Sequence, residues 1–167
     1  MSSLPHPNNL YFDAAVGWMM LGNAREAIAE LDHLDLASRQ APGVLELEWT
    51  IHAKTSNWDR ALATARTLLQ IAPENPSGWI HQAYSLRRAT GGGLSNAWNA
   101  LLPAAKMFPR ESIIPYNLAC YAAQLNHPDE AWDWLKKAAA MGDKNHIRAM
   151  AETDPDLTPL KERLKEL

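Results

Sequence analysis

The sequence predicts an all-α fold, a solenoid of about four helical hairpins followed by a capping helix. Three observations predict it. Alanine, leucine and tryptophan are abundant while β-branched residues are few, a bias that favours helix over sheet. One six-residue pattern recurs four times at nearly constant spacing. After each copy, apolar residues follow at steps of three and four, which places them on one face of a helix.

The recurring pattern begins as a turn and ends on a small residue. Its last residues are Ala27, Ala61, Ala97 and Ala131, separated by 34, 36 and 34 positions. We expect a second helix of a hairpin to run through each alanine. A proline falls twelve residues after Ala61 and again after Ala97, where the helix should stop.

A further helical segment precedes each turn, at about residues 9–21, 43–55, 76–90 and 112–125. The predicted repeats are 8–41, 42–75, 76–111 and 112–142, within a single domain that spans 1–167. Asn23 and Asn57 are expected to cap second helices, and Pro128 to occupy a first helical position. Pro103 should interrupt the second helix of the third repeat, because it removes a backbone donor. The run Gly91–Gly93 indicates a longer turn in that repeat.

Residues 143–167 are predicted to cap the array. Asp154–Pro159 should start a last helix at 159–166. Leu160, Leu164 and Leu167 would then cover the apolar end of the last repeat, as terminal units of repeat arrays require.

The 34-residue helical hairpin resembles the tetratricopeptide repeat, whose pattern is W-x2-L-G-x2-Y, then A-x3-F, then P. The four alanines match its close-packing position, and Tyr116–Ala119 follows the family's first-helix run. Trp79 with Ala83, and Tyr11 with Ala15, match less completely. The second repeat departs most, because it has Glu48 and Trp49 where leucine and glycine are expected.

This resemblance implies a right-handed α–α superhelix whose first helices line a concave surface that binds a protein or peptide. The predicted lining is Phe12, Val16, Met19, Glu46, Thr50, Lys54, Ile80, His81, Tyr84, Arg87, Tyr116, Asn117, Cys120 and Gln124, with Arg88 as a further candidate. We hypothesise a client with apolar anchors and an acidic group that meets Arg87, assisted by Lys54. Alternatively, Arg87 and Arg88 only stabilise the negative end of a helix.

Chaperone-binding members of the family hold a terminal carboxylate with lysines and asparagines. The matching positions here are Phe12, Val16, Leu47, Ser77 and His81, so the sequence lacks that clamp.

No residue pattern indicates catalysis, a metal or a cofactor. Cys120 lies mid-helix with no activating neighbour in the sequence, which favours a buried or groove-lining thiol over a nucleophile. The six histidines show no metal-ligand spacing, and Gly91–Gly93 lacks the lysine and hydroxyl of a phosphate loop. We therefore expect a protein that is not an enzyme.

Charge and composition limit the classes of partner and the compartment that the sequence suggests. The net charge of −3 does not suggest nucleic acid, and no apolar run is long enough to span a membrane. A single cysteine and a start without a signal peptide favour the cytoplasm. Residues 1–50 carry two basic and seven acidic side chains, whereas 51–110 carry seven basic and two acidic. This polarity would allow chains to associate, so a self-assembling structural module is one alternative to an adaptor. A small secretion-type chaperone is another alternative.

Overall fold

The computed structural model describes residues 4–167, which are helical and contain no strand. The described chain divides into two compact units, residues 4–90 and residues 91–167. The boundary falls at the start of Gly91–Gly93, so the expected third repeat is divided between the two units. The single domain over 1–167 stays a prediction. The prediction that the sequence starts without a signal peptide involves residues 1–3, which lie outside the described residues.

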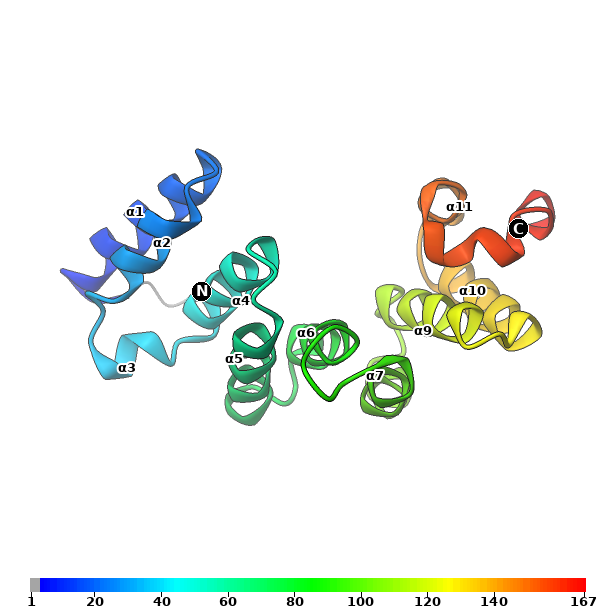
Figure 1. Ribbon diagram of the computed structural model, residues 1–167, viewed down its shortest axis with the longest axis horizontal. Helices are drawn as coiled ribbons and strands as arrows, with labels where there is room; N and C mark the ends of the chain where they lie inside the picture. Colours follow the sequence, from blue (N-terminus) through cyan, green and yellow to red (C-terminus); the bar gives the residue numbers. More distant parts are fainter. Residues whose placement is uncertain (1–3) are drawn as a thin grey trace. The chain divides into compact units, whose positions relative to one another are not determined.

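The first unit contains two helical hairpins and the first helix of the third predicted repeat. Its helices are α1 (Asn8–Met20), α2 (Ala24–Leu31), α3 (Leu36–Arg39), α4 (Pro42–Lys54), α5 (Trp58–Ile71) and α6 (Pro76–Leu86). Helices α1 and α2 pack as one hairpin and α4 and α5 as the next, and α6 packs against α5 (Figure 1). The predicted first helices are thus confirmed, although α6 ends four residues earlier than expected.

The short helix α3 was not predicted, and a polar junction explains it. The Asp35 carboxylate accepts a hydrogen bond from the Ser38 backbone N–H at 2.7 Å, which caps α3. Asn8 at the start of α1 donates to the same carboxylate at 2.8 Å and accepts from the Asp35 backbone N–H at 3.0 Å. These hydrogen bonds hold the loop after α2 against the beginning of the first hairpin.

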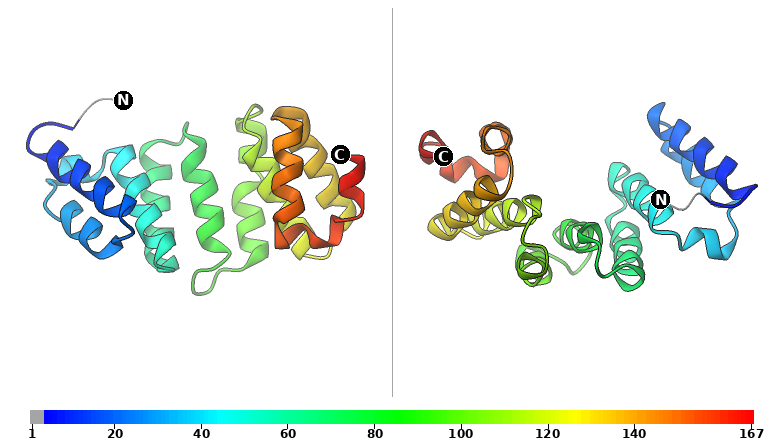
Figure 2. Two further views of the ribbon diagram at one scale, coloured as in Figure 1. Left: turned by 90° about the horizontal axis from the view of Figure 1, so that it is seen from above. Right: turned by 180° about the vertical axis from the view of Figure 1, so that it is seen from behind.

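The second unit contains one complete hairpin and the C-terminal segment. Its elements are α7 (Leu94–Leu101), α8 (Ala104–Met107), α9 (Ile113–Gln124), α10 (Pro128–Met141), α11 (Lys144–Thr153), and the 3₁₀ helices η1 (Pro155–Leu160) and η2 (Arg163–Glu166). Helices α9, α10 and α11 lie side by side (Figure 2). The predicted interruption at Pro103 is confirmed, since it separates α7 from α8.

The small residues of the repeat lie where helices approach each other closely. Ala27, Ala61, Ala97 and Ala131 are all completely buried. Gly78 serves the same purpose between α5 and α6, because a Cβ there would lie 3.1 Å from the Leu69 backbone. The prediction that these positions are packing sites is confirmed.

Two of the three predicted helix starts are confirmed in full. The Asn23 side chain accepts from the Glu26 backbone N–H at 3.3 Å, and Pro128 begins α10. Asn57 does occupy the cap position of α5, but its side chain makes no capping hydrogen bond, so that part of the prediction is wrong. Asp59 places a negative charge in the first turn instead, where it complements the helix dipole.

The C-terminal segment differs from its predicted form. The expected helix at 159–166 is wrong: α11 precedes two short 3₁₀ helices, because Pro155 and Pro159 each remove a backbone donor. Leu160, Leu164 and Leu167 are nevertheless buried, as expected. Among residues 4–167, no helix is both long and apolar enough to cross a membrane.

Candidate functional site

The candidate binding face of the first unit is the side formed by α1, α4 and α6. Helix α1 contacts α4, and α4 contacts α6, so predicted lining residues from three helices are brought onto neighbouring elements. Lys54 is exposed, and the half-buried ones are Phe12, Val16, Glu46, Thr50, Ile80, His81, Tyr84 and Arg87. Met19 differs, because it is buried in the core of the first hairpin. We therefore leave Met19 out of the face.

An aromatic stack joins α4 to α6 at the centre of this face. The rings of Trp49 and His81 are parallel, with centroids 3.6 Å apart, and Tyr84 meets Trp49 edge-on at 6.0 Å. Trp49 also donates a hydrogen bond to the Ser85 hydroxyl at 2.9 Å. The tryptophan that departs from the repeat pattern thus fixes the distance between two first helices.

Arg88 closes one end of the stack. Its guanidinium lies 3.8 Å from the Tyr84 ring centroid and 5.1 Å from that of Trp58. It also donates to the Tyr84 carbonyl at 3.0 Å, at the end of α6. Arg88 therefore has the helix-ending role that was the alternative to ligand binding, and it reinforces the aromatic packing.

The polar residues of α4 are mostly engaged within the unit. One oxygen of Glu46 accepts from the Ser77 hydroxyl at 2.7 Å and from the Asn75 amide at 3.3 Å. The Thr50 hydroxyl donates to the Glu46 carbonyl at 2.8 Å. These bonds tie α4 to the start of α6 and leave Lys54 as the exposed charge at the end of α4.

In the second unit, the chain's own C-terminal segment covers the predicted lining of α9. Tyr116 is buried and donates its hydroxyl hydrogen to Asp154 at 3.0 Å, while the Cys120 thiol lies 3.5 Å from the same carboxylate oxygen. Gln124 donates to the Asp156 carbonyl at 3.0 Å. Asn117 bonds back to the Ile113 carbonyl of its own helix at 3.0 Å. The stripe is formed as expected, but Tyr116 and Cys120 are not open to solvent.

Burial has the largest effect on the pKa of Tyr116, which lies between α9 and the C-terminal segment. It raises the pKa of Tyr116, and the neighbouring Cys120 and Asp154 act in the same direction. The phenol therefore remains a hydrogen-bond donor at neutral pH. Potential metal ligands of Cys120, Asp154 and Asp156 lie within 4.8 Å of one another. Asp154 is already used by Tyr116 and by the Asp156 backbone N–H at 2.9 Å, which makes this group a structural junction between α9 and η1.

The sequence matches no protein-family model, and no curated protein matches it significantly. The structure is similar to that of TTC0263, a thermophilic TPR protein of Thermus thermophilus, with a TM-score of 0.70 and 21% identity over 96% of this chain and all of that one. The chain has the tetratricopeptide-repeat (TPR) fold.

Two other solved structures agree. MamA RS-1, in a double mutant, has a TM-score of 0.68 and 13% identity over 89% of this chain and 79% of that one. Cut9 in the APC/C hetero-tetramer Cut9–Hcn1 has a TM-score of 0.66 and 15% identity over 94% of this chain but only 30% of that one. At these identities the likeness establishes the TPR fold alone.

The contacts of two important residues, Trp49 and Asp154, were not predicted from the sequence. Trp49 was noticed as a departure from the pattern, but its contact with His81 depends on packing between helices 32 positions apart. Asp154 was expected at the start of the last helix, and its role as the acceptor for Tyr116 depends on how the C-terminal segment folds back. The available signal was an aspartate before a proline, which predicts a helix start and no long-range contact.

Acid should destabilise the first unit of this TPR fold through His81. Burial lowers its pKa to about 4 from an ordinary value of 6.5, partly opposed by Glu46, and its Nδ1 is buried without a hydrogen-bond partner. The unfolded chain therefore binds a proton between pH 6.5 and 4 that the folded chain does not, and stability falls as the pH falls through this window. His81→Phe, which keeps a ring on Trp49, should flatten this loss in urea unfolding followed by circular dichroism.

The control is His146→Gln, at an exposed position. It should leave the pH dependence between 4 and 6.5 as in the wild type. An unchanged slope in His81→Phe would remove His81 from the explanation.

Proposed function

We propose that this protein is an interaction module that binds a segment of a partner protein on the candidate binding face of α1, α4 and α6, and that it catalyses no reaction. The segment has apolar side chains and at least one acidic group. The observation that carries the proposal is a face on which half-buried apolar and aromatic side chains lie beside polar ones, next to an exposed lysine and an arginine at a helix end.

The fold supports a partner that is a protein. Repeat arrays offer extended surfaces for binding because each hairpin contacts only its neighbours. Cut9, which has a similar fold, was crystallised in a hetero-tetramer with Hcn1. A shared fold does not determine function, so the kind of segment that binds has to be inferred from the chemistry of the face.

The chemistry of the face suits an apolar and acidic segment. Phe12 and Val16 present aliphatic and aromatic surface on α1, and Tyr84 does so on α6. Lys54 and Arg87 lie at the C-terminal ends of α4 and α6. A charge-assisted hydrogen bond from either to a carboxylate contributes about 1.5–3 kcal/mol when partly shielded from water.

The second unit supplies an internal example of such recognition. The stripe of α9 holds η1 and the residue before it, a segment in which Asp154 accepts from Tyr116 while Leu157 and Leu160 are fully buried. Helix α9, the first helix of its hairpin, thus already packs against a short segment that combines aspartates with leucines. The proposed client has the same combination.

The test is affinity capture with the full chain from its native cell in high salt, followed by fluorescence anisotropy with labelled peptides of the captured protein. Lys54→Glu should weaken binding by about tenfold or more, because it places a like charge against the client's acid. Arg87→Ala should weaken it less. The control Arg66→Glu changes an exposed charge on α5, outside the face, and should have no effect. Equal binding by all three variants would contradict the proposed face.

Self-association is a second candidate, because the N-terminal end of the first unit exposes several large apolar side chains. They are Leu10, Met20, Leu21 and Leu36, between 53% and 85% exposed. Isolated apolar residues are ordinary on surfaces, but these four side chains all belong to the first hairpin and to α3, which follows it. Sedimentation of the full chain should then show a concentration-dependent dimer that Met20→Ser with Leu21→Ser abolishes. A monomer at all concentrations would exclude this candidate.

A further inference from the structure

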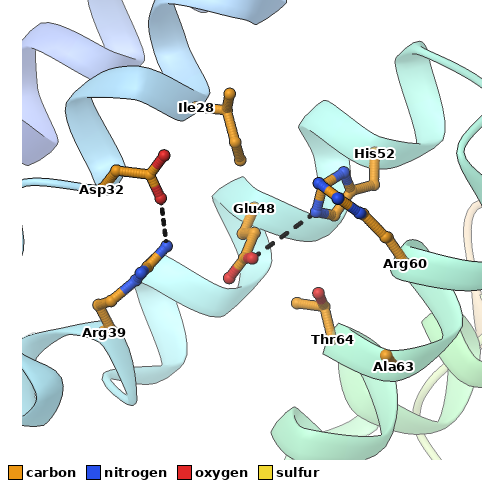
Figure 3. A pocket seen from close by; sticks show the side chains of 8 residues that line it. All are labelled: Ile28, Asp32, Arg39, Glu48, His52, Arg60, Ala63 and Thr64. Atoms are coloured by element: carbon orange, nitrogen blue, oxygen red, sulfur yellow. Dashed lines mark hydrogen bonds and ion pairs between the residues drawn. The ribbon is translucent and has the colours of Figure 1, made fainter.

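A polar pocket of about 300 Å³ lies in the first unit, among α2, α3, α4 and α5 (Figure 3). It is lined by Ile28, Asp32, Arg39, Glu48, His52, Arg60, Ala63 and Thr64. None of these residues belongs to the face proposed to bind a protein segment, so the pocket needs its own explanation.

The pocket lies at the strongest departure from the repeat pattern. Glu48 occupies the position where the repeat expects a leucine, and in Figure 3 its side chain lies at the centre of the group. A leucine would fill space between helices, whereas the carboxylate faces a cavity that admits small molecules. Such a local violation of an otherwise consistent pattern is typical of a functional position.

The charges in the pocket are balanced. Arg39 pairs with Asp32 at 2.8 Å, and the Nε2 atom of buried His52 lies 3.6 Å from Glu48. Arg60 also lines the pocket and makes no hydrogen bond or ion pair with the described residues. The lining thus holds two arginines and two carboxylates, with His52 beside Glu48.

This balance decides the class of ligand. A simple anion at Arg60 would lie near the Glu48 carboxylate, and a simple cation at Glu48 would lie near two guanidinium groups, so each would meet repulsion. A molecule that carries both charges meets attraction at both ends. Ile28 and Ala63 add an apolar surface to the same cavity.

We propose that this pocket binds a small zwitterion, a free α-amino acid with an apolar side chain. Its carboxylate accepts hydrogen bonds from Arg60, with the Thr64 hydroxyl as a second donor. Its ammonium group donates to Glu48, and its side chain packs on Ile28. The ligand contacts α2, α4 and α5 together, and it therefore stabilises the first unit when it is bound.

The test is a two-dimensional NMR titration of the full chain with three matched probes. L-leucine carries both charges, 4-methylpentanoate lacks the ammonium group, and 3-methylbutylamine lacks the carboxylate. L-leucine should give saturable shifts at backbone amides around Glu48 and Arg60. Each single-charge probe should bind about tenfold more weakly or worse, because it loses one charge-assisted contact.

Variants assign the contacts. Arg60→Gln should weaken L-leucine binding by about tenfold, while Arg66→Gln, an exposed change on the same helix, should leave it unchanged. Glu48→Leu restores the residue of the repeat pattern and should fold normally by circular dichroism yet bind no L-leucine. The proposal is overturned if L-leucine gives no saturable shifts, if either single-charge probe binds equally well, or if Arg60→Gln binds like the wild type.

Discussion

Leu118→Ala is expected to lower the free energy of unfolding by about 3 kcal/mol. Leu118 lies in α9 and is completely buried in the second unit. Removing a buried leucine side chain costs its transfer from water plus the cavity left behind, about 2–5 kcal/mol in total. Urea unfolding, followed by circular dichroism at 222 nm (the helical band), should show a lower midpoint with an unchanged slope.

The matched control for this leucine is Leu102→Ala. Leu102 is 38% exposed and lies in the turn between α7 and α8 of the same unit. Its truncation should cost well under half as much as that of Leu118. Equal losses in the two variants would mean that α9 is not the centre of the second unit's core.

Ala131→Leu is expected to destabilise the chain by about 1–3 kcal/mol, although it adds apolar surface. Ala131 is completely buried in the first turns of α10, where that helix packs on α9. Extra methylene groups in a closely packed contact force side chains and backbone to shift, and that strain exceeds the gain from burial. The same urea experiment measures the effect.

Ala140→Leu is the control, since Ala140 is exposed on the same helix. It should change the free energy of unfolding by less than about 0.5 kcal/mol. A stable Ala131→Leu variant would show that the recurring alanine is not a site of close helix packing in this chain.

The fold was largely predictable because it depends on local and periodic signals. Four alanines at intervals of 34 to 36 residues lie in α2, α5, α7 and α10, and all four are buried as expected. The interruption after α7 could be predicted from Pro103 alone, because proline lacks a backbone donor. The 3₁₀ form of the C-terminus was not predictable to the same degree, because its leucines indicated burial without indicating helix type.

The candidate site was less predictable because it depends on contacts between distant residues. Helical spacing placed Lys54 and Tyr84 on first helices, but spacing does not reveal what covers them. Tyr116 matched the repeat pattern well, yet its exposure is decided by Asp154, 38 residues later. The pocket around Glu48 was visible only as a mismatch with the pattern, and its arginines and carboxylates meet only when α2, α3, α4 and α5 come together.

Site-specific photo-crosslinking in the native cell can show whether α1, α4 and α6 form the binding face for a partner protein. The photoreactive amino acid p-benzoylphenylalanine would replace Val16 on α1 or Lys54 on α4, and Arg66 on α5 as the outer position. We expect Val16 and Lys54 to give crosslinks to the same partner protein and Arg66 to give none. Crosslinks that form only from Arg66 would contradict a binding face made by α1, α4 and α6.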